Sequence, residues 1–127
     1  MTNKVVLTFK DGKILKGLTS NFFPNKNTFH LSTEDGQITE VNREDLKAIF
    51  FVKDYSGNKA RKDMYDDHIP GAGRKIQVMF KDNEVITGFC QGYSSDRPGF
   101  FIVPAAKEGN NERIFIVTSA TATVKFL

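Results

Sequence analysis

The sequence predicts an all-β protein made of two tandem five-stranded small bent β-barrels that are related by internal duplication. The segment that begins at Lys4 returns at Lys75, an offset of 71 (75 − 4), and the two stretches align without a gap as far as Phe29 and Phe100. Apolar and polar residues alternate in the same phase in both copies, which is typical of half-buried strands. No long stretch has the spacing of an amphipathic helix.

The first strand of each copy is predicted by its alternation. Its inward positions are apolar in both copies: Val5, Leu7 and Phe9 in one, and Ile76, Val78 and Phe80 in the other. Each strand runs into a dipeptide, Asp11-Gly12 or Asp82-Asn83, whose residues tolerate positive φ. The first two strands of each copy therefore form a hairpin.

The second strand, 13–20 or 84–91, carries a glycine at the same place in both copies, Gly17 and Gly88. Glycine weakens a strand interior, so its presence in both copies predicts a bend or a close approach of the backbone. Three further strands are predicted in each copy, at 28–32, 37–41 and 47–52, and at 100–103, 113–117 and 123–127. The alignment places five extra residues of the second copy within 104–112.

These elements divide the chain into a first barrel at 1–53, a linker at 54–74 with one short helical turn near 59–64, and a second barrel at 75–127. Domains of roughly 50 residues bury only about 60% of their unfolded surface. The two halves are therefore expected to depend on each other for stability.

Composition sets limits on the function. The net charge of +3 comes from 18 basic and 15 acidic residues, which is too mild for a dedicated nucleic-acid binder. The one cysteine, Cys90, excludes an internal disulfide and suits a reducing compartment. The sequence shows no signal peptide and no apolar run of membrane length, so we expect a soluble cytoplasmic protein without a membrane partner.

The run from Leu7 through Asp11-Gly12 to Gly17, followed later by Leu46-Lys47-Ala48-Ile49, resembles the Sm-like barrel. That family has the same strand, Asp-Gly, strand and glycine opening, and its small SH3-like barrels often assemble into rings on RNA. The Arg-Gly pair that this family carries before its last strand is missing here, so the resemblance does not transfer RNA contacts.

The sequence is also similar to a group of uncharacterised bacterial proteins with this tandem unit, some of them attached to PilZ-type signalling modules. The similar stretches are 47–54, 92–101 and 110–113. The paired arginines and the complete Asp-x-Ser-x-x-Gly motif of a cyclic-dinucleotide site are absent, so direct binding of such a ligand is not expected.

No catalytic constellation is visible. His30 and Cys90 occupy strand positions and His68 lies in the linker, so no nucleophile and base are paired. Asp66-Asp67-His68 lacks a fourth metal ligand, and Gly71-Ala72-Gly73 lacks the third glycine of a dinucleotide loop. We therefore predict a non-enzyme with no catalytic residue, no metal and no cofactor.

The loops in which the two copies differ are the candidate binding sites. Exposed aromatic residues beside Lys or Arg are typical of protein interfaces and of base-stacking platforms. The alternative is that Phe22 and Phe23 cap the barrel ends and that the polar residues form ordinary turns. The candidate residues are Phe22, Phe23, Lys26, Tyr93, Asp96, Arg97, Asn110, Asn111 and Arg113.

The resulting hypothesis is a non-enzymatic binding or adaptor module for an unknown protein partner, in bacterial signalling or regulation, with a possible homo-oligomer. One alternative is an Sm-like RNA-binding protein, for which Lys10, Lys13, Lys16 and Lys26 would contact phosphate. A second alternative is a small-ligand sensor with a pocket between the two copies.

Overall fold

Ten antiparallel strands form a single sheet in the computed structural model, which describes residues 2–52, 73–90, 92–94, 96–104 and 111–127. The all-β prediction is confirmed. Two three-residue 3-10 helices, η1 (Arg43–Asp45) and η2 (Thr118–Ala120), precede β5 and β10. The strands are β1 (Asn3–Phe9), β2 (Ile14–Thr19), β3 (Thr28–Thr33), β4 (Ile38–Asn42), β5 (Leu46–Val52), β6 (Arg74–Phe80), β7 (Val85–Cys90), β8 (Gly99–Pro104), β9 (Asn111–Val117) and β10 (Thr121–Phe126).

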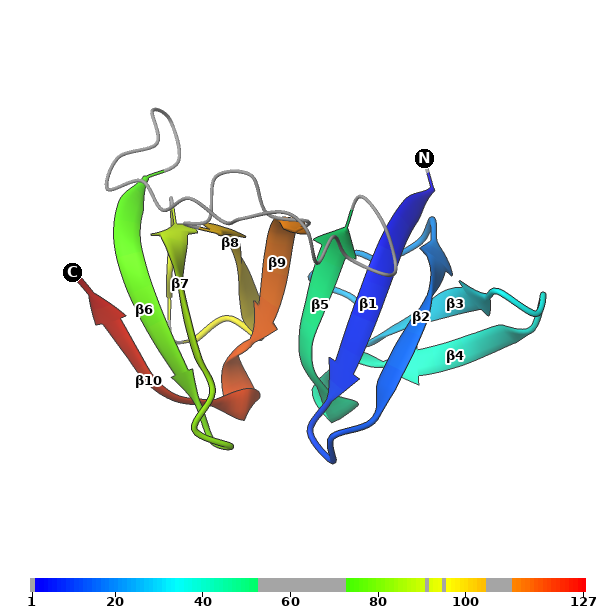
Figure 1. The fold of residues 1–127 in the computed structure, drawn as a ribbon, viewed down its shortest axis with the longest axis horizontal. Coiled ribbons are helices and arrows are strands. Elements are labelled where there is room, and N and C mark those ends of the chain that lie inside the picture. The colour runs from blue at the N-terminus through cyan, green and yellow to red at the C-terminus, as the bar shows by residue number, and fades with distance from the viewer. Residues whose placement is uncertain (1, 53–72, 91, 95, 105–110) are drawn as a thin grey trace, which may run out of the picture.

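The sheet is continuous and open. Its strand order is β10-β6-β7-β8-β9-β5-β1-β2-β3-β4, so β10 and β4 are its edges and lie at opposite ends of the molecule (Figure 1). The pairing of β5 with β9 joins the two halves, and we call it the joint. The strands thus pair across the halves in one bent sheet, instead of closing into two separate barrels.

Strand order and register are the same in the two halves. Thr28 lies opposite Asn42 across β3 and β4, and Gly99 lies opposite Val117 across β8 and β9. The offset is 71 for the first residue of each pair (99 − 28) and 75 for the second (117 − 42). The second half therefore has four extra residues between these strands, and the prediction of five was wrong by one position.

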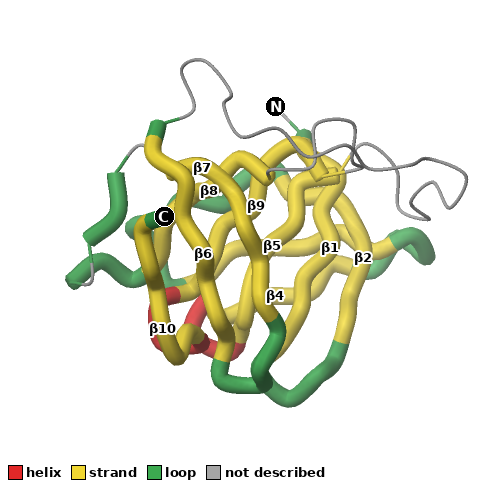
Figure 2. Tube along the Cα trace, turned by 60° about the vertical axis from the view of Figure 1, so that its left-hand side comes forward, coloured by secondary structure: helices red, strands yellow, loops and turns green. Residues whose placement is uncertain are grey.

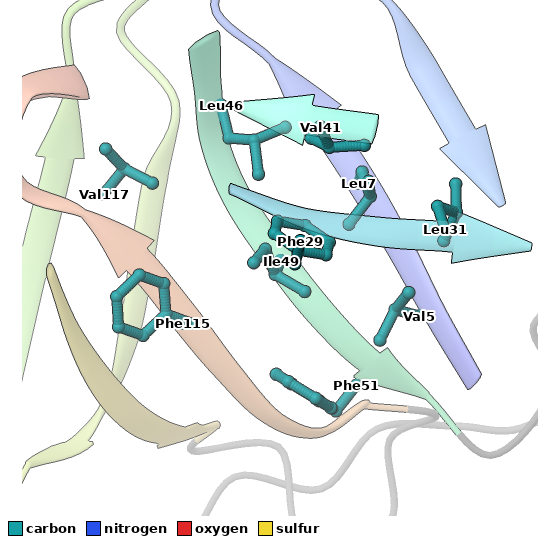
Figure 3. Close-up of a cluster of buried hydrophobic side chains, with 10 residues drawn as sticks. All are labelled: Val5, Leu7, Phe29, Leu31, Val41, Leu46, Ile49, Phe51, Phe115 and Val117. Atoms are coloured by element: carbon teal, nitrogen blue, oxygen red, sulfur yellow. The ribbon is translucent and has the colours of Figure 1, made fainter. Parts of the chain in front are cut away.

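Two apolar cores lie on opposite faces of the joint, because β5 and β9 send alternate side chains to each face. Ile49 and Phe51 of β5 belong to the first core, and Ala48 belongs to the second. Phe115 and Val117 of β9 enter the first core, beside side chains of β1 and β5 (Figure 3). Each half thus completes the other half's core, which fits the expected dependence between them.

Gly17 and Gly88, which occupy equivalent positions in the two halves, have the predicted role. A Cβ atom on Gly17 would clash with the carbonyl oxygen of Ser32, and one on Gly88 would clash with that of Val103. The neighbouring strand passes too close for a side chain, because the sheet is strongly curled (Figure 2). The backbone approach predicted from the sequence is therefore confirmed in both halves.

The predicted linker lies largely outside the described residues, including the helical turn at 59–64. Its last residue, Arg74, begins β6. Within the described chain, no helix has the length and apolar character needed to cross a membrane.

Candidate functional site

An open groove of about 680 Å³ lies where the second half meets the β2–β3 loop of the first. We call it the arginine groove, because its wall carries two guanidinium groups among apolar side chains. Its described lining residues are Pro24, Asn25, Phe89, Gly92, Arg97, Pro98, Gly99, Phe100, Phe101, Ile102, Val103, Arg113 and Phe115.

Arg113 lies over two aromatic rings at the joint. It lies in β9 opposite Phe51 of β5, and its guanidinium carbon is 4.4 Å from the Phe51 ring centroid and 4.9 Å from that of Phe101. Stacking over the rings leaves the in-plane N–H groups of a guanidinium free to donate. Arg113 is exposed and so presents these donors to the groove.

Arg97 approaches from the β7–β8 loop and is also exposed. Among the described residues, neither Arg97 nor Arg113 has a carboxylate partner. Two cations without a carboxylate partner among the described residues therefore line one groove, although they are sixteen residues apart in the chain (113 − 97).

The floor of the groove depends on a glycine. A side chain on Gly99 would occupy the place of the Phe115 ring, which is fully buried and edge-on to Phe101 at 5.0 Å. Phe101 and Val103 remain partly exposed beside it. The groove therefore offers apolar surface next to its two cations.

Arg43, which the sequence analysis missed, anchors the opposite wall. Its buried guanidinium donates to the carbonyl oxygens of Pro24 and Lys26, each at 2.9 Å, and to Asn27 Oδ1 at 3.2 Å. It also contacts the Glu44 carboxylate at 3.1 Å. No local pattern separates it from a surface arginine, since only the returning β2–β3 loop buries it.

The first-half candidates divide between core and surface. Phe22 packs edge-on against Phe29 and Phe115, both with centroids at 5.1 Å, so it caps the first core and does not stand free. Phe23 is 49% exposed, and Lys26 Nζ lies 4.9 Å from its ring centroid. Of these residues, only Phe23 and Lys26 present the aromatic and basic surface that the sequence predicted.

The other second-half candidates do not line the arginine groove among the described residues. Tyr93 packs edge-on against Phe100 at 4.8 Å, as Phe22 does against Phe29. Asp96 is exposed and accepts a hydrogen bond from Ser94, which makes it a turn residue. Asn110 lies outside the described residues, and for Asn111 the structure describes only the backbone, opposite Val52.

A second polar cluster links the halves away from these candidates. Lys47 of β5 donates to Asp82 at 2.7 Å and to Glu84, and its ammonium lies 4.8 Å from the Phe80 ring centroid. Burial works to lower the pKa of Lys47, but its bonds to the two carboxylates outweigh burial and raise that pKa above its usual value. The bond from Lys47 lowers the pKa of Asp82.

Among the described residues, His30 and Cys90 lie in different surroundings. His30 contacts Asn21 and Glu40 on the surface, and Cys90 is buried in the second core. In the described chain, no three His, Cys, Asp or Glu side chains gather as metal ligands. The stretch 66–68 lies outside the described residues. Chemically, the arginine groove is suited to hold an anionic group attached to an apolar one.

Fold and site together define an all-β protein with an open, arginine-lined groove. The chain belongs to a family of unknown function, DUF6982, whose model matches residues 1–127. No curated protein and no solved structure gives a significant match.

Proposed function

We propose that this chain is a non-enzymatic binding module that holds a segment of a partner protein in the arginine groove. The segment carries a carboxylate next to an apolar side chain. The observation that carries this proposal is Arg113, stacked on Phe51 and Phe101 without a carboxylate partner among the described residues.

Three features of the groove support a peptide as the occupant. A guanidinium pre-oriented on rings is well placed for bidentate bonds to a carboxylate. The partly exposed Phe101 and Val103 offer contact area for an apolar residue. Arg43 fixes the facing loop, so less conformational entropy is lost on binding.

The remaining parts of the proposal concern origin and setting. The shared strand order and register support descent of both halves from one small bent β-sheet unit. Cytoplasmic bacterial signalling or regulation is the setting that we propose from the sequence resemblance.

Selection of a phage-displayed random peptide library on the full chain tests the binding. We expect enriched peptides to pair Asp, Glu or a free carboxyl terminus with an aromatic or aliphatic residue. Arg113→Ala should weaken their binding roughly 10- to 100-fold in fluorescence polarisation, because it removes charge-assisted bonds.

The matched control is Arg74→Ala. Arg74 also lies over a phenylalanine, with its guanidinium carbon 4.4 Å from the Phe126 ring centroid, but it belongs to β6, which neighbours the β10 edge of the sheet, and it does not line the groove. Equal losses in the two variants, or enrichment of peptides without acidic groups, would exclude the groove as the binding site.

RNA binding is less well supported by the side-chain contacts. Lys10 donates to Ser119, Lys13 lies over Phe9, and Lys26 lies over Phe23. A labelled single-stranded RNA added at low salt gives a direct comparison. Salt-sensitive RNA binding that is lost in Arg113→Ala would favour the RNA-binding alternative over the peptide proposal. Saturation of the groove by a small anion alone would favour the small-ligand sensor.

A further inference from the structure

The two edge strands of the sheet correspond to the two strands that pair at the joint. Since the halves share one strand order, β10 is the counterpart of β5 and β4 is the counterpart of β9. Inside the chain β5 pairs with β9, whereas among the described strands β10 and β4 each have a neighbour on one side only. Each molecule therefore carries both sides of a second joint, at opposite ends (Figure 1).

We propose that β4 of one copy pairs antiparallel with β10 of the next copy, so that molecules associate head to tail by repeating the internal joint. The occupant of each sheet edge is thus a second copy of this chain. This proposal is independent of the arginine groove. Such a heterologous contact builds a closed ring or an open filament.

The internal register fixes the pairing. Phe115 lies opposite Ile49, and Arg113 lies opposite Phe51. Each β9 residue has its counterpart in β4 at a number 75 lower. Each β5 residue has its counterpart in β10 at a number 75 higher (126 − 51), because Val5 pairs with Phe51 and its counterpart Ile76 pairs with Phe126. Glu40 therefore faces Val124 of the next copy, and Ile38 faces its Phe126.

The backbone groups of both edges point the right way for this register. Thr33 N–H bonds to the Gln37 carbonyl, and Arg43 N–H bonds to that of Asn27. Because bonding direction alternates along a strand, Ile38 and Glu40 direct their N–H and C=O groups away from β3.

The same alternation applies at the other edge. Leu127 N–H bonds to the Lys75 carbonyl, so Val124 and Phe126 direct their backbone groups away from β6. The four residues with outward groups are the ones that the register places opposite each other.

One pair of apolar side chains meets across the proposed contact. Ile38 is 73% exposed and Phe126 38% exposed, and the register makes them direct neighbours. Pairing would remove the apolar surface of both side chains from water, which stabilises the contact.

The two sides of the contact have also changed together. In the first core Phe22 meets Phe101 and Phe115 of the other half. The counterpart of Phe22 is Tyr93 (93 − 71), which has a hydroxyl. The counterparts of Phe101 and Phe115 are His30 and Glu40, which lie 3.8 Å apart. A polar group has thus replaced an apolar one on both sides.

The ends are complementary in charge. The β3–β4 hairpin, residues 28–42, carries Glu34, Asp35 and Glu40 and no Lys or Arg. The β10–β6 edge, residues 121–127 and 74–80, carries Arg74, Lys75 and Lys125 and no acidic residue. Opposite charges favour head-to-tail contact and disfavour pairing of two like ends.

Sedimentation velocity over a range of concentrations of the full chain tests the association. We expect a concentration-dependent shift to dimers and larger species. Glu40→Pro removes an outward N–H without breaking the β3–β4 ladder, and should weaken association at least about tenfold relative to the matched control Glu40→Ala. Circular dichroism confirms that both variants fold.

Cysteine pairs test the register itself. Ile114 faces Phe50, so Thr39 of one copy faces Lys125 of the next. The double variant Thr39→Cys, Lys125→Cys should form disulfide-linked ladders on mild oxidation. The control Glu40→Cys, Lys125→Cys directs its thiols to opposite faces of the sheet and should not.

A chain that stays monomeric at all concentrations would overturn the proposal and would show that the polar residues of β4 and β10 keep the edges apart. Association unaffected by Glu40→Pro, or equal cross-linking in the two cysteine pairs, would overturn the β4–β10 contact as its cause.

Discussion

The β2–β3 and β7–β8 loops occupy equivalent places in the two halves but are held in different ways. Buried Arg43 binds three acceptors in the β2–β3 segment. Its counterpart is Thr118 (118 − 43 = 75), whose backbone N–H bonds to the Pro98 carbonyl at 3.0 Å. The Thr118 hydroxyl is buried without a partner in the described part of the chain.

The two walls of the arginine groove therefore differ in the bonds that hold them. The wall that contains Pro24 is fixed by charge-assisted bonds from within its own half. The wall that contains Arg97 is held by a few backbone bonds, among them Arg97 N–H to the Ser94 carbonyl at 3.3 Å. Among the described residues, the wall with Pro24 therefore has the charge-assisted bonds of a buried arginine, and the wall with Arg97 has none of that kind.

The largest expected change in stability comes from a substitution in β9, compared with the equivalent substitution in β4. Phe115→Ala should destabilise the chain by about 3–5 kcal/mol, because it opens a cavity in the first core. At the counterpart, Glu40→Ala should change stability by less than about 0.5 kcal/mol in the monomer. Urea unfolding at low protein concentration measures both.

The same experiment tests the dependence between the halves. Phe115 belongs to the second half but packs in the first core, so wild type and Phe115→Ala should each unfold in one transition. Two separate transitions would show that the halves fold independently.

Arg43→Ala should cost about 2–3 kcal/mol, because it leaves loop carbonyl groups without donors. Thr118→Val is the matched change, and should be neutral within about 0.5 kcal/mol, because the hydroxyl that it removes has no partner among the described residues. Similar losses in the two variants would show that the loops are held alike. Thermal unfolding measures both.

Lys47→Met should cost about 1 kcal/mol, through the lost contacts with Phe80 and two carboxylates. The raised pKa of Lys47 means that its contribution is present below its unfolded pKa of about 10.4 and is lost as pH rises through the folded value.

The lowered pKa of Asp82 means that its contribution is present above its unfolded pKa of about 3.9 and is lost as pH falls through the folded value. The gap between wild type and Lys47→Met should therefore be widest near neutral pH and shrink in acid and in strong alkali. A gap that is constant from about pH 2 to 11 would contradict the ionic link.

The smallest effect concerns the hairpin turns. Gly12 has φ of 94° and its counterpart Asn83 has φ of 74°. Gly12→Asn should therefore lower the free energy of unfolding, measured by urea unfolding, by about 0.5 kcal/mol or less. Gly12→Val should lower it by about 1–2 kcal/mol. Equal losses of unfolding free energy in the two variants would show that the tolerance of the new residue for positive φ does not decide the outcome.

Local patterns predicted the strands well, because alternation and turn chemistry act over a few residues. Gly17 and Gly88 were found in this way, since they stand at equivalent positions of the two halves. The joint was not predicted, because β5 and β9 are apolar on both faces and a buried strand of this kind does not reveal its neighbour.

The candidate site was predicted only in part. Arg97 and Arg113 were selected as residues of divergent loops, and the joint brings both to one groove. The sequence could not place Phe22 in the core, because the phenylalanines around it come from β3, β5, β8 and β9. Arg43 was missed because its three acceptors lie 16–19 positions away.

The joint also has a kinetic consequence during synthesis. β5 is complete at Val52, but its partner β9 ends at Val117, so translation must continue well past the first half before the pairing can form. At about 5–20 residues per second, this interval lasts several seconds. Throughout it, the apolar run Ala48-Ile49-Phe50-Phe51-Val52 has an open edge, and the nascent chain is most exposed to aggregation and to chaperones.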